Sequence, residues 1–296
     1  MVTKKSITKS APKDVVKKKS KSAPAHIGLV KNDSYLSPYE DIIRGRHEHA
    51  LWKIKQLTQD GKMTLSDFAN GYNYYGLHLT DEGWIFREWA PNATEIYLVG
   101  DFNGWKELPS YKCKRIEGTG NWELRLPVHA MEHGQYYKMR VHWNGGEGER
   151  IPAWAQRVVQ DENTKIFSAQ VWNVEEPYVW KKKNFKPSTD PLLIYEGHIG
   201  MSQDAEKVGS YTEFRENVLP RIIKDGYNAI QIMAIQEHPY YGSFGYHVSS
   251  FLAASSRFGT PEELKALIDE AHRNGIAVIM DIVHSHAVKN EVEGLG

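Results

Sequence analysis

Residues 276–286 read IAVIMDIVHSH and contain the strongest indication of the fold. The apolar residues 276–280 fit a buried parallel strand, because such strands are covered on both faces. Asp281, His284 and His286 follow where that strand ends. In α/β barrels the chemistry lies at the C-terminal ends of the strands. The stretch therefore predicts a parallel sheet with a functional site at this edge.

Two similar apolar runs lie earlier in the chain, at residues 192–196 and 229–233. A helical pattern over residues 211–226 separates them, and a second helix opens after Thr260 with a proline and a capping-box glutamate. Strands that alternate with helices predict parallel βαβ units. No glycine-rich phosphate loop follows these strands, which argues against a nucleotide-binding sheet. We therefore expect residues 191–296 to form an α/β domain.

The pattern changes over residues 74–175, where short runs of β-forming residues alternate with turn clusters. The runs cover residues 84–89, 95–99, 121–126 and 135–141. Their spacing predicts an antiparallel, immunoglobulin-like β-sandwich of about 100 residues. Residues 176–190 are rich in lysine and proline and are expected to be a linker.

Two further segments precede the sandwich. Residues 1–34 are expected to be a disordered tail, because they are rich in Lys and Ser and hold few large apolar residues. Such a tail can be a solvated extension or can contact nucleic acid; we favour the extension and predict no nucleic-acid partner. Residues 35–73 are expected to be a helical segment, with Ser37 as its cap, Pro38 in the first helical position and Ile42 on its apolar stripe.

Composition restricts the location of the protein. The single cysteine, Cys113, excludes an internal disulfide framework and fits a reducing compartment. No stretch approaches the roughly 20 apolar residues of a membrane span, and the tail has no apolar region typical of a secretory signal. We therefore expect a cytoplasmic protein without a membrane partner.

Polar and aromatic side chains follow all three predicted strands. In chain order they are Glu196, His198, Gln236, Glu237, His238, Tyr240, Tyr241, Phe244, Tyr246, Asp281, His284 and His286. Because parallel strands end at one edge of a sheet, we expect these residues to gather around one opening. Carboxylates and imidazoles bind hydroxyl groups and aromatic rings stack on sugar faces, so the set favours a polyhydroxylated substrate.

Other interpretations of these residues stay open. Glu196 can pair with a neighbouring side chain, Tyr240 and Tyr241 can be wall residues, and His238 can shape the turn before a proline. His284 and His286 have the spacing of a metal-binding pair in a metal hydrolase. In barrel hydrolases that pair typically lies on the first strand, whereas here two βα units precede it, so we predict no metal site.

Three segments in consistent order resemble the branching enzymes of the α-amylase family, glycoside hydrolase family 13. These are residues 195–202 (YEGHIGMS), 244–246 (FGY) and 281–290 (DIVHSHAVKN). The sandwich, with GDFNGW at residues 100–105, resembles the glycogen-binding module, carbohydrate-binding module 48, that precedes the barrel in these enzymes. The leading helix is similar to the eukaryotic-type subgroup. The resemblance covers about residues 35–296.

The resemblance implies a glycosyltransferase of glycogen biosynthesis. Such an enzyme cuts α-1,4-glucan and reattaches the chain as an α-1,6 branch with retention, so the implied partners are glycogen, amylose and amylopectin. The resemblance implies that the enzyme uses no cofactor and that the full-length protein is a monomer. The fold it implies for residues 191–296 is the first three βα units of a (β/α)8 TIM barrel, incomplete because eight are needed.

The resemblance also assigns roles to residues of the strand ends. Asp281 resembles the acid of the first conserved motif, His286 the histidine that binds a sugar hydroxymethyl group, and Tyr246 the tyrosine beneath that sugar. Glu237, His238 and Tyr240 complete the expected substrate-binding set. Ser285 stands where amylases have an asparagine that often helps hold calcium, which weakens any calcium site.

The family's reaction is a double displacement that needs a carboxylate nucleophile and a carboxylic acid. The resemblance places these on later strands, so we expect both to lie beyond Gly296 and the catalytic residues of this chain to be unknown. The chain alone is then expected to be inactive. The alternative is a non-catalytic glucan-binding protein that works through the sandwich. In the sandwich, Asn103 and Trp105 are either part of a tight turn with a core tryptophan or glucan contacts.

Overall fold

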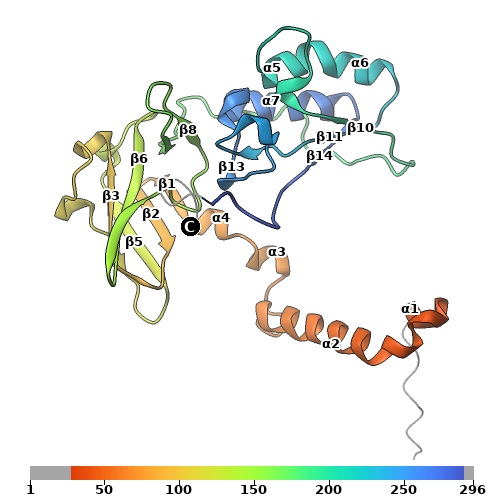
Figure 1. The fold of residues 1–296 in the computed structure, drawn as a ribbon, viewed down its shortest axis with the longest axis horizontal. Helices are drawn as coiled ribbons and strands as arrows, with labels where there is room; N and C mark the ends of the chain where they lie inside the picture. Colours follow the sequence, from red (N-terminus) through yellow and green to blue (C-terminus); the bar gives the residue numbers. More distant parts are fainter. Residues whose placement is uncertain (1–27, 290–296) are drawn as a thin grey trace, which may run out of the picture. The chain divides into compact units, whose positions relative to one another are not determined.

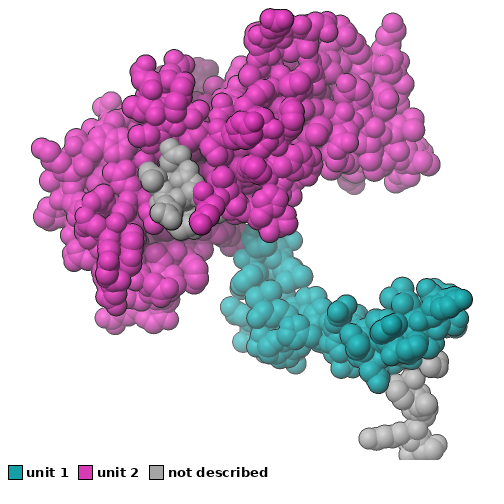
Figure 2. Space-filling model, viewed as in Figure 1, with its two compact units in different colours: residues 1–69 teal, residues 70–296 magenta. Residues whose placement is uncertain are grey.

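The computed structural model describes residues 28–289 (Figure 1). The chain forms two compact units, residues 1–69 and residues 70–296 (Figure 2). Each unit is described by itself below. None of the helices within residues 28–289 has both the length and the apolar character that crossing a membrane requires.

The first unit is helical. Its elements are α1 (Gly28–Asn32), the 3-10 helix η1 (Ser34–Tyr39), α2 (Glu40–Leu57) and α3 (Leu65–Phe68). The predicted disorder is therefore wrong for residues 28–34, while residues 1–27 lie outside the described residues. The predicted cap is also wrong, because Asp33 rather than Ser37 accepts the capping N–H, from Tyr35. Pro38 lies inside η1, where a short 3-10 turn tolerates it.

The second unit opens with α4 (Gly71–Tyr74) and continues into two antiparallel sheets. The first sheet has the order β1 (Gly76–Thr80), β2 (Gly83–Trp89), β5 (Asn121–Leu126), β4 (Lys114–Arg115). The second has the order β3 (Ala93–Gly100), β6 (Tyr136–Trp143), β9 (Phe167–Gln170), β8 (Val158–Gln160), and β7 (Gly146–Arg150) also pairs with β6. The short helices η2 (Asp101–Asn103), η3 (Pro109–Tyr111) and η4 (Val128–Ala130) lie in their connections.

One apolar core joins the two sheets. Phe86 and Trp122 of the first sheet and Ile96, Met139 and Phe167 of the second belong to the same buried cluster. Because alternate residues of a strand face opposite sides, each strand sends its apolar half inward. All four β-runs predicted from the sequence are confirmed as strands, and they form a sandwich of two sheets.

A three-stranded parallel sheet follows, in the order β10 (Ile194–Gly197), β11 (Ala229–Ile232), β14 (Ala277–Met280). The remaining elements lie around it: η5 (Ile199–Met201), α5 (Tyr211–Glu213), the π-helical turn η6 (Phe214–Val218), α6 (Leu219–Lys224), β12 (Gln236–Glu237), η7 (Tyr241–Ser243), β13 (Ser250–Ala254), η8 (Ser256–Phe258) and α7 (Pro261–Arg273). The predicted parallel βαβ arrangement is confirmed. Thr260 and Glu263 form the predicted capping box of α7.

The helix predicted over residues 211–226 is interrupted. A π-helical turn occupies Phe214–Val218, and α6 begins at Leu219 with Pro220 in its first turn. A proline offers no backbone donor and crowds the carbonyl of the preceding turn, so a regular α-helix cannot run through it. The helix therefore widens before Pro220 and starts again there.

The segment between the sandwich and the parallel sheet is attached to α7 through one carboxylate. Asp269 is 1% exposed and accepts bonds from the Tyr178 hydroxyl at 2.7 Å and the backbone N–H groups of Lys181 and Lys182 at 2.7 and 2.8 Å. Burial alone would raise the pKa of Asp269, but these donors outweigh it and lower the pKa. The expected linker is thus held on the α/β part at a defined place.

Candidate functional site

The register of the parallel sheet brings three strand ends together. Gly197, Ile232 and Met280 are paired neighbours across β10, β11 and β14. Figure 1 shows the three strands running side by side. The residues that follow each strand therefore leave the sheet at the same edge, as the sequence predicts.

At this edge, Tyr246, Asp281 and His286 form one hydrogen-bonded group. The Tyr246 hydroxyl donates to Oδ2 of Asp281 at 2.9 Å. Nε2 of His286 lies 2.8 Å from the Tyr246 carbonyl and donates to it, since a carbonyl can only accept. In the neutral ring, Nδ1 then accepts from the Ser285 hydroxyl at 2.9 Å. Burial, and then the bond to Asp281, raise the pKa of the Tyr246 hydroxyl.

The backbone beside Tyr246 depends on a glycine. Gly245 has a φ of +91°, and a Cβ there would lie 1.9 Å from the carbonyl oxygen of Ala234. Only glycine fits such an approach. The FGY segment thereby brings Tyr246 over the end of the third strand, and its side chain stays 36% exposed.

Gln236 connects the second and third strand ends. Its Oε1 accepts the N–H of Val283 at 2.8 Å, and its Nε2 donates to the Phe251 carbonyl at 2.9 Å. Because Gln236 is 4% exposed, both bonds lie away from water. This residue holds the segment that carries Asp281 and His286 against the β12–β13 hairpin.

Glu237 and His238 are enclosed by the protein. Both are 0% exposed. Glu237 accepts the N–H of Ser256 at 2.7 Å and that of His238 at 3.1 Å, and burial raises the pKa of its carboxyl. Nδ1 of His238 bonds the Gln236 carbonyl at 3.0 Å, and burial lowers the pKa of its ring. The expectation that these two side chains touch substrate does not fit this burial; they tie the β12 loop to η8 instead.

The other strand-end residues divide into exposed and enclosed groups. Tyr240 is 64% exposed. Glu196 accepts a 2.9 Å hydrogen bond from Nε2 of Gln231, which supports the interpretation that Glu196 pairs with a neighbouring side chain. His198 is 5% exposed among the rings of Tyr241, Phe244 and Phe258, and burial lowers the pKa of its imidazole. His284 packs near Phe251, and within residues 28–289 it belongs to no group of three or more possible metal ligands.

On the sandwich, the turn at residues 100–105 presents an exposed indole. Trp105 is 40% exposed, so its interpretation as a core residue is wrong. Its Nε1 donates to Asp101 at 3.0 Å, and its φ is +60°. Asn103 works inside the turn, because its Oδ1 accepts the Gly100 N–H at 3.0 Å and its Nδ2 donates to the Leu98 carbonyl at 2.9 Å.

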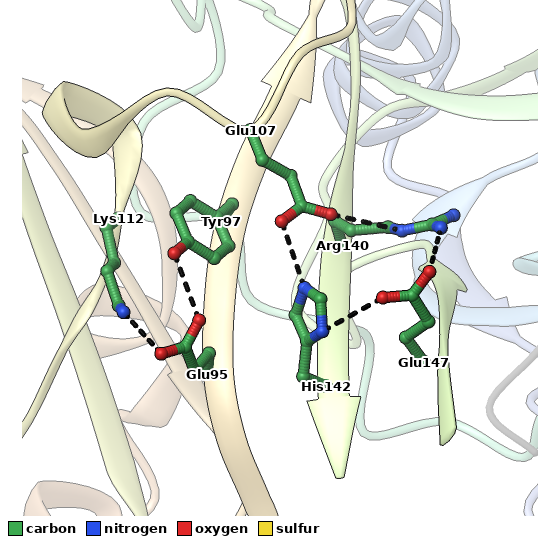
Figure 3. A network of polar contacts seen from close by, with 7 residues as sticks. All are labelled: Glu95, Tyr97, Glu107, Lys112, Arg140, His142 and Glu147. Atoms are coloured by element: carbon green, nitrogen blue, oxygen red, sulfur yellow. Dashed lines mark hydrogen bonds and ion pairs between the residues drawn. The ribbon is translucent and has the colours of Figure 1, made fainter.

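The outer surface of β3, β6 and β7 carries a polar network (Figure 3). His142 lies between two carboxylates, with Nε2 3.0 Å from Glu107 and Nδ1 3.1 Å from Glu147. Within residues 28–289 these three are the group whose ligand atoms could hold a metal ion. Arg140 already pairs with both carboxylates, at 3.3 and 2.7 Å. The Arg140 guanidinium supplies the positive charge that a metal would bring. We therefore interpret Glu107, His142 and Glu147 as part of an ion-pair network.

Comparison with known families assigns both parts of the second unit. Residues 74–155 match the carbohydrate-binding module 48 family, described as the isoamylase N-terminal domain. Residues 218–293 match the α-amylase catalytic domain. The order of the two matches is the order of the sandwich and the parallel sheet.

Curated relatives extend the match to most of the chain. A 1,4-alpha-glucan-branching enzyme of Dictyostelium discoideum is 42% identical over 90% of this chain and 40% of its own length. Those of Yarrowia lipolytica and Saccharomyces cerevisiae are each 45% identical over 90% of this chain, and over 39% and 41% of their own lengths. Nine tenths of the chain is therefore similar to 1,4-alpha-glucan-branching enzymes. The chain spans about 40% of the length of these relatives.

Solved structures show the same fold at lower identity. A pullulanase from Bacillus acidopullulyticus aligns with a TM-score of 0.60 and 20% identity, over 74% of this chain and 30% of that one. A pullulanase from Paenibacillus barengoltzii aligns with a TM-score of 0.58 and 22% identity, over 72% and 38%. The chain therefore shares its fold with parts of these proteins.

Proposed function

We propose that this chain is part of a cytoplasmic 1,4-α-glucan branching enzyme that acts on glycogen or a related α-glucan. The observation that carries the proposal is the group formed by Tyr246, Asp281 and His286 at the ends of parallel strands, in a chain 42–45% identical to branching enzymes. The Asp281 carboxylate and the Tyr246 phenol oxygen keep acceptor lone pairs for sugar hydroxyls, beside an aromatic ring. The exposed imidazole of His286 can exchange its present bonds for bonds to a sugar.

We infer that β10, β11 and β14 are the first three strands of a (β/α)8 barrel and that the sandwich is an immunoglobulin-like module. In this assignment Asp281 and His286 hold the sugar and Tyr246 stacks beneath it. Tyr240, which is 64% exposed, stays in the proposed glucan-contacting set. The nucleophile and the general acid belong to later strands of the family's barrel and are assigned to no residue of this chain.

Two experiments test the proposal. The purified 296-residue chain is expected to form no α-1,6 branches from amylose, measured after debranching of the product; measurable branching would contradict the assignment of both catalytic carboxylates to later strands. A chimera, in which this chain replaces the aligned part of the Saccharomyces cerevisiae relative, is expected to form branches. Asp281→Asn in that chimera is expected to lower branching at least 100-fold, whereas the exposed Trp52→Ala should leave it unchanged.

A second candidate is a glucan-binding protein that works through the sandwich, favoured by the exposed and anchored indole of Trp105. Under either candidate the full chain is expected to sediment with glycogen. Trp105→Ala should weaken that sedimentation if the turn contacts glucan. A Trp105→Ala chain that binds as well as the parent would remove Trp105 from the binding residues.

A further inference from the structure

A groove of about 380 Å³ lies where the sandwich, the linker and α7 meet in the second unit. Its lining includes four aromatic and two polar side chains, and the other five lining residues are apolar. The aromatic and polar ones are Tyr72, Trp154, Trp172, Trp180, Gln156 and Lys265. They come from five separate segments of the chain, so no local sequence pattern reveals the groove. Its volume lies in the range of ligand-binding clefts, roughly 300–1,000 Å³.

The first indole, Trp154, is fixed by the residues behind it. Its ring stacks on Tyr75 with centroids 5.0 Å apart and an interplanar angle of 21°. Gly71 lies so close that a Cβ there would be 2.7 Å from the indole. A glycine at this position therefore makes room for the ring. The Tyr75 hydroxyl is itself held by Asn121 at 2.9 Å, which connects the stack to β5.

The second indole, Trp172, is fixed by polar contacts. Its Nε1 donates to Glu262 of α7 at 3.0 Å. The guanidinium of Arg157 lies 4.9 Å from the ring centroid, and the His133 ring lies 4.7 Å away. The bond to Glu262 joins the sandwich side of the groove to α7. Both indoles are therefore held in place before any ligand arrives, which reduces the ordering cost of binding.

The third indole, Trp180, is carried by the linker. It is 39% exposed and makes an edge contact with Tyr178 at 5.5 Å, whose hydroxyl bonds Asp269 at 2.7 Å. Tyr72, on the rim, is 56% exposed. The anchored linker thus supplies a third flat ring next to two fixed ones, with polar groups of Gln156 and Lys265 beside them.

We propose that this groove is a second glucan site, which binds an α-1,4-glucan chain across the sandwich and α7. Flat, fixed rings suit the apolar faces of pyranoses, and the few polar groups suit their hydroxyls. Lys265 pairs with Glu262 at 3.5 Å, so the lining carries no surplus of charge that would favour a phosphate or nucleic acid. Its residues differ from both the strand-end group and the Trp105 turn. The proposal rests on the proposed function, because that function supplies the glucan.

Binding of maltoheptaose to the full 296-residue chain tests the site, with isothermal titration calorimetry as the measurement. Trp180→Ala and Tyr72→Ala remove exposed rings and should leave the fold intact, which circular dichroism checks. Each is expected to weaken affinity about tenfold, the usual effect of removing an aromatic anchor. Trp52→Ala, which removes an indole 51% exposed in the first unit, is the matched control and should bind like the parent.

The outcomes separate the two proposals. If the parent binds no maltoheptaose, glucan binding by this chain fails, and the groove proposal fails with it. If the parent binds, and Trp105→Ala weakens binding while both groove variants bind normally, the groove proposal is overturned and the proposed function stands. If neither Trp180→Ala nor Tyr72→Ala changes the affinity for maltoheptaose, the groove proposal is likewise overturned.

Discussion

The hydroxyl of Tyr246 donates a 2.9 Å hydrogen bond to Oδ2 of Asp281, across 35 residues of sequence. This bond connects the loop after the second parallel strand to the end of the third. It orients the carboxylate and the phenol ring together, so the two side chains act as one unit of the strand-end group.

The two residues are expected to lose stability together. Tyr246→Phe, which removes the donor, and Asp281→Ala, which removes the acceptor, should each lower the free energy of unfolding by about 1 kcal/mol, the usual net value of one hydrogen bond. The double variant should lose about as much as either single variant, because one bond is removed in all three. Urea denaturation measures these values. Tyr240→Phe, at a side chain 64% exposed, is the control, and fully additive losses would show that the bond does not couple the pair.

Glu237 is expected to make stability fall as pH rises. Burial raises the pKa of its carboxyl above the ordinary 4.5, so the folded state keeps a proton that the unfolded state loses. Stability should decline from about pH 4.5 up to the raised pKa and level off above it. Glu237→Gln cannot titrate and should lose this part of the decline. Urea denaturation of the parent and of Glu237→Gln between pH 4 and 7 measures the free energy of unfolding at each pH. If the two proteins show the same pH dependence, the raised pKa of Glu237 is contradicted.

Asp269 is expected to make stability fall as pH is lowered, the opposite of the effect of Glu237. Its pKa is lowered from the ordinary 3.8, so its contribution to stability is present above 3.8 and is lost as pH falls through the lowered value. At neutral pH, Asp269→Asn leaves a backbone donor of the linker poorly satisfied and should cost about 1–3 kcal/mol. Below the lowered pKa the two proteins should converge. Glu270→Gln, in a surface pair with Arg273, is the control; an equal loss there would show that the linker contact is unimportant.

The network around His142 is expected to need no metal. Because Arg140 already pairs with Glu107 and Glu147, adding EDTA should leave the melting temperature unchanged. A lower melting temperature in EDTA, restored by Zn²⁺, would show a resident metal. Arg140→Ala should increase zinc binding, measured by calorimetry, because it frees both carboxylates.

Local sequence signals predicted the elements whose structure depends on local physics. The apolar run 276–280 became β14, and Thr260 with Glu263 became the capping box of α7. Local signals misplaced the cap at Ser37, because the helical segment begins earlier with the 3-10 helix η1, which Asp33 caps. The single helix over 211–226 was wrong because Pro220 breaks the backbone ladder despite the continuous apolar pattern.

The sequence by itself determined the strands, their order along the chain, and which side chains follow them, because alternation and apolar periodicity are local properties. Tertiary structure alone decided which of those side chains face water. Glu237 and His238 lie two or three residues before Tyr240 but are enclosed, since Glu237 bonds Ser256 of η8 and His238 bonds the Gln236 carbonyl. It also decided that Trp154, Trp172 and Trp180 share one groove. The physical reason is that burial and proximity depend on long-range packing, which no local pattern encodes.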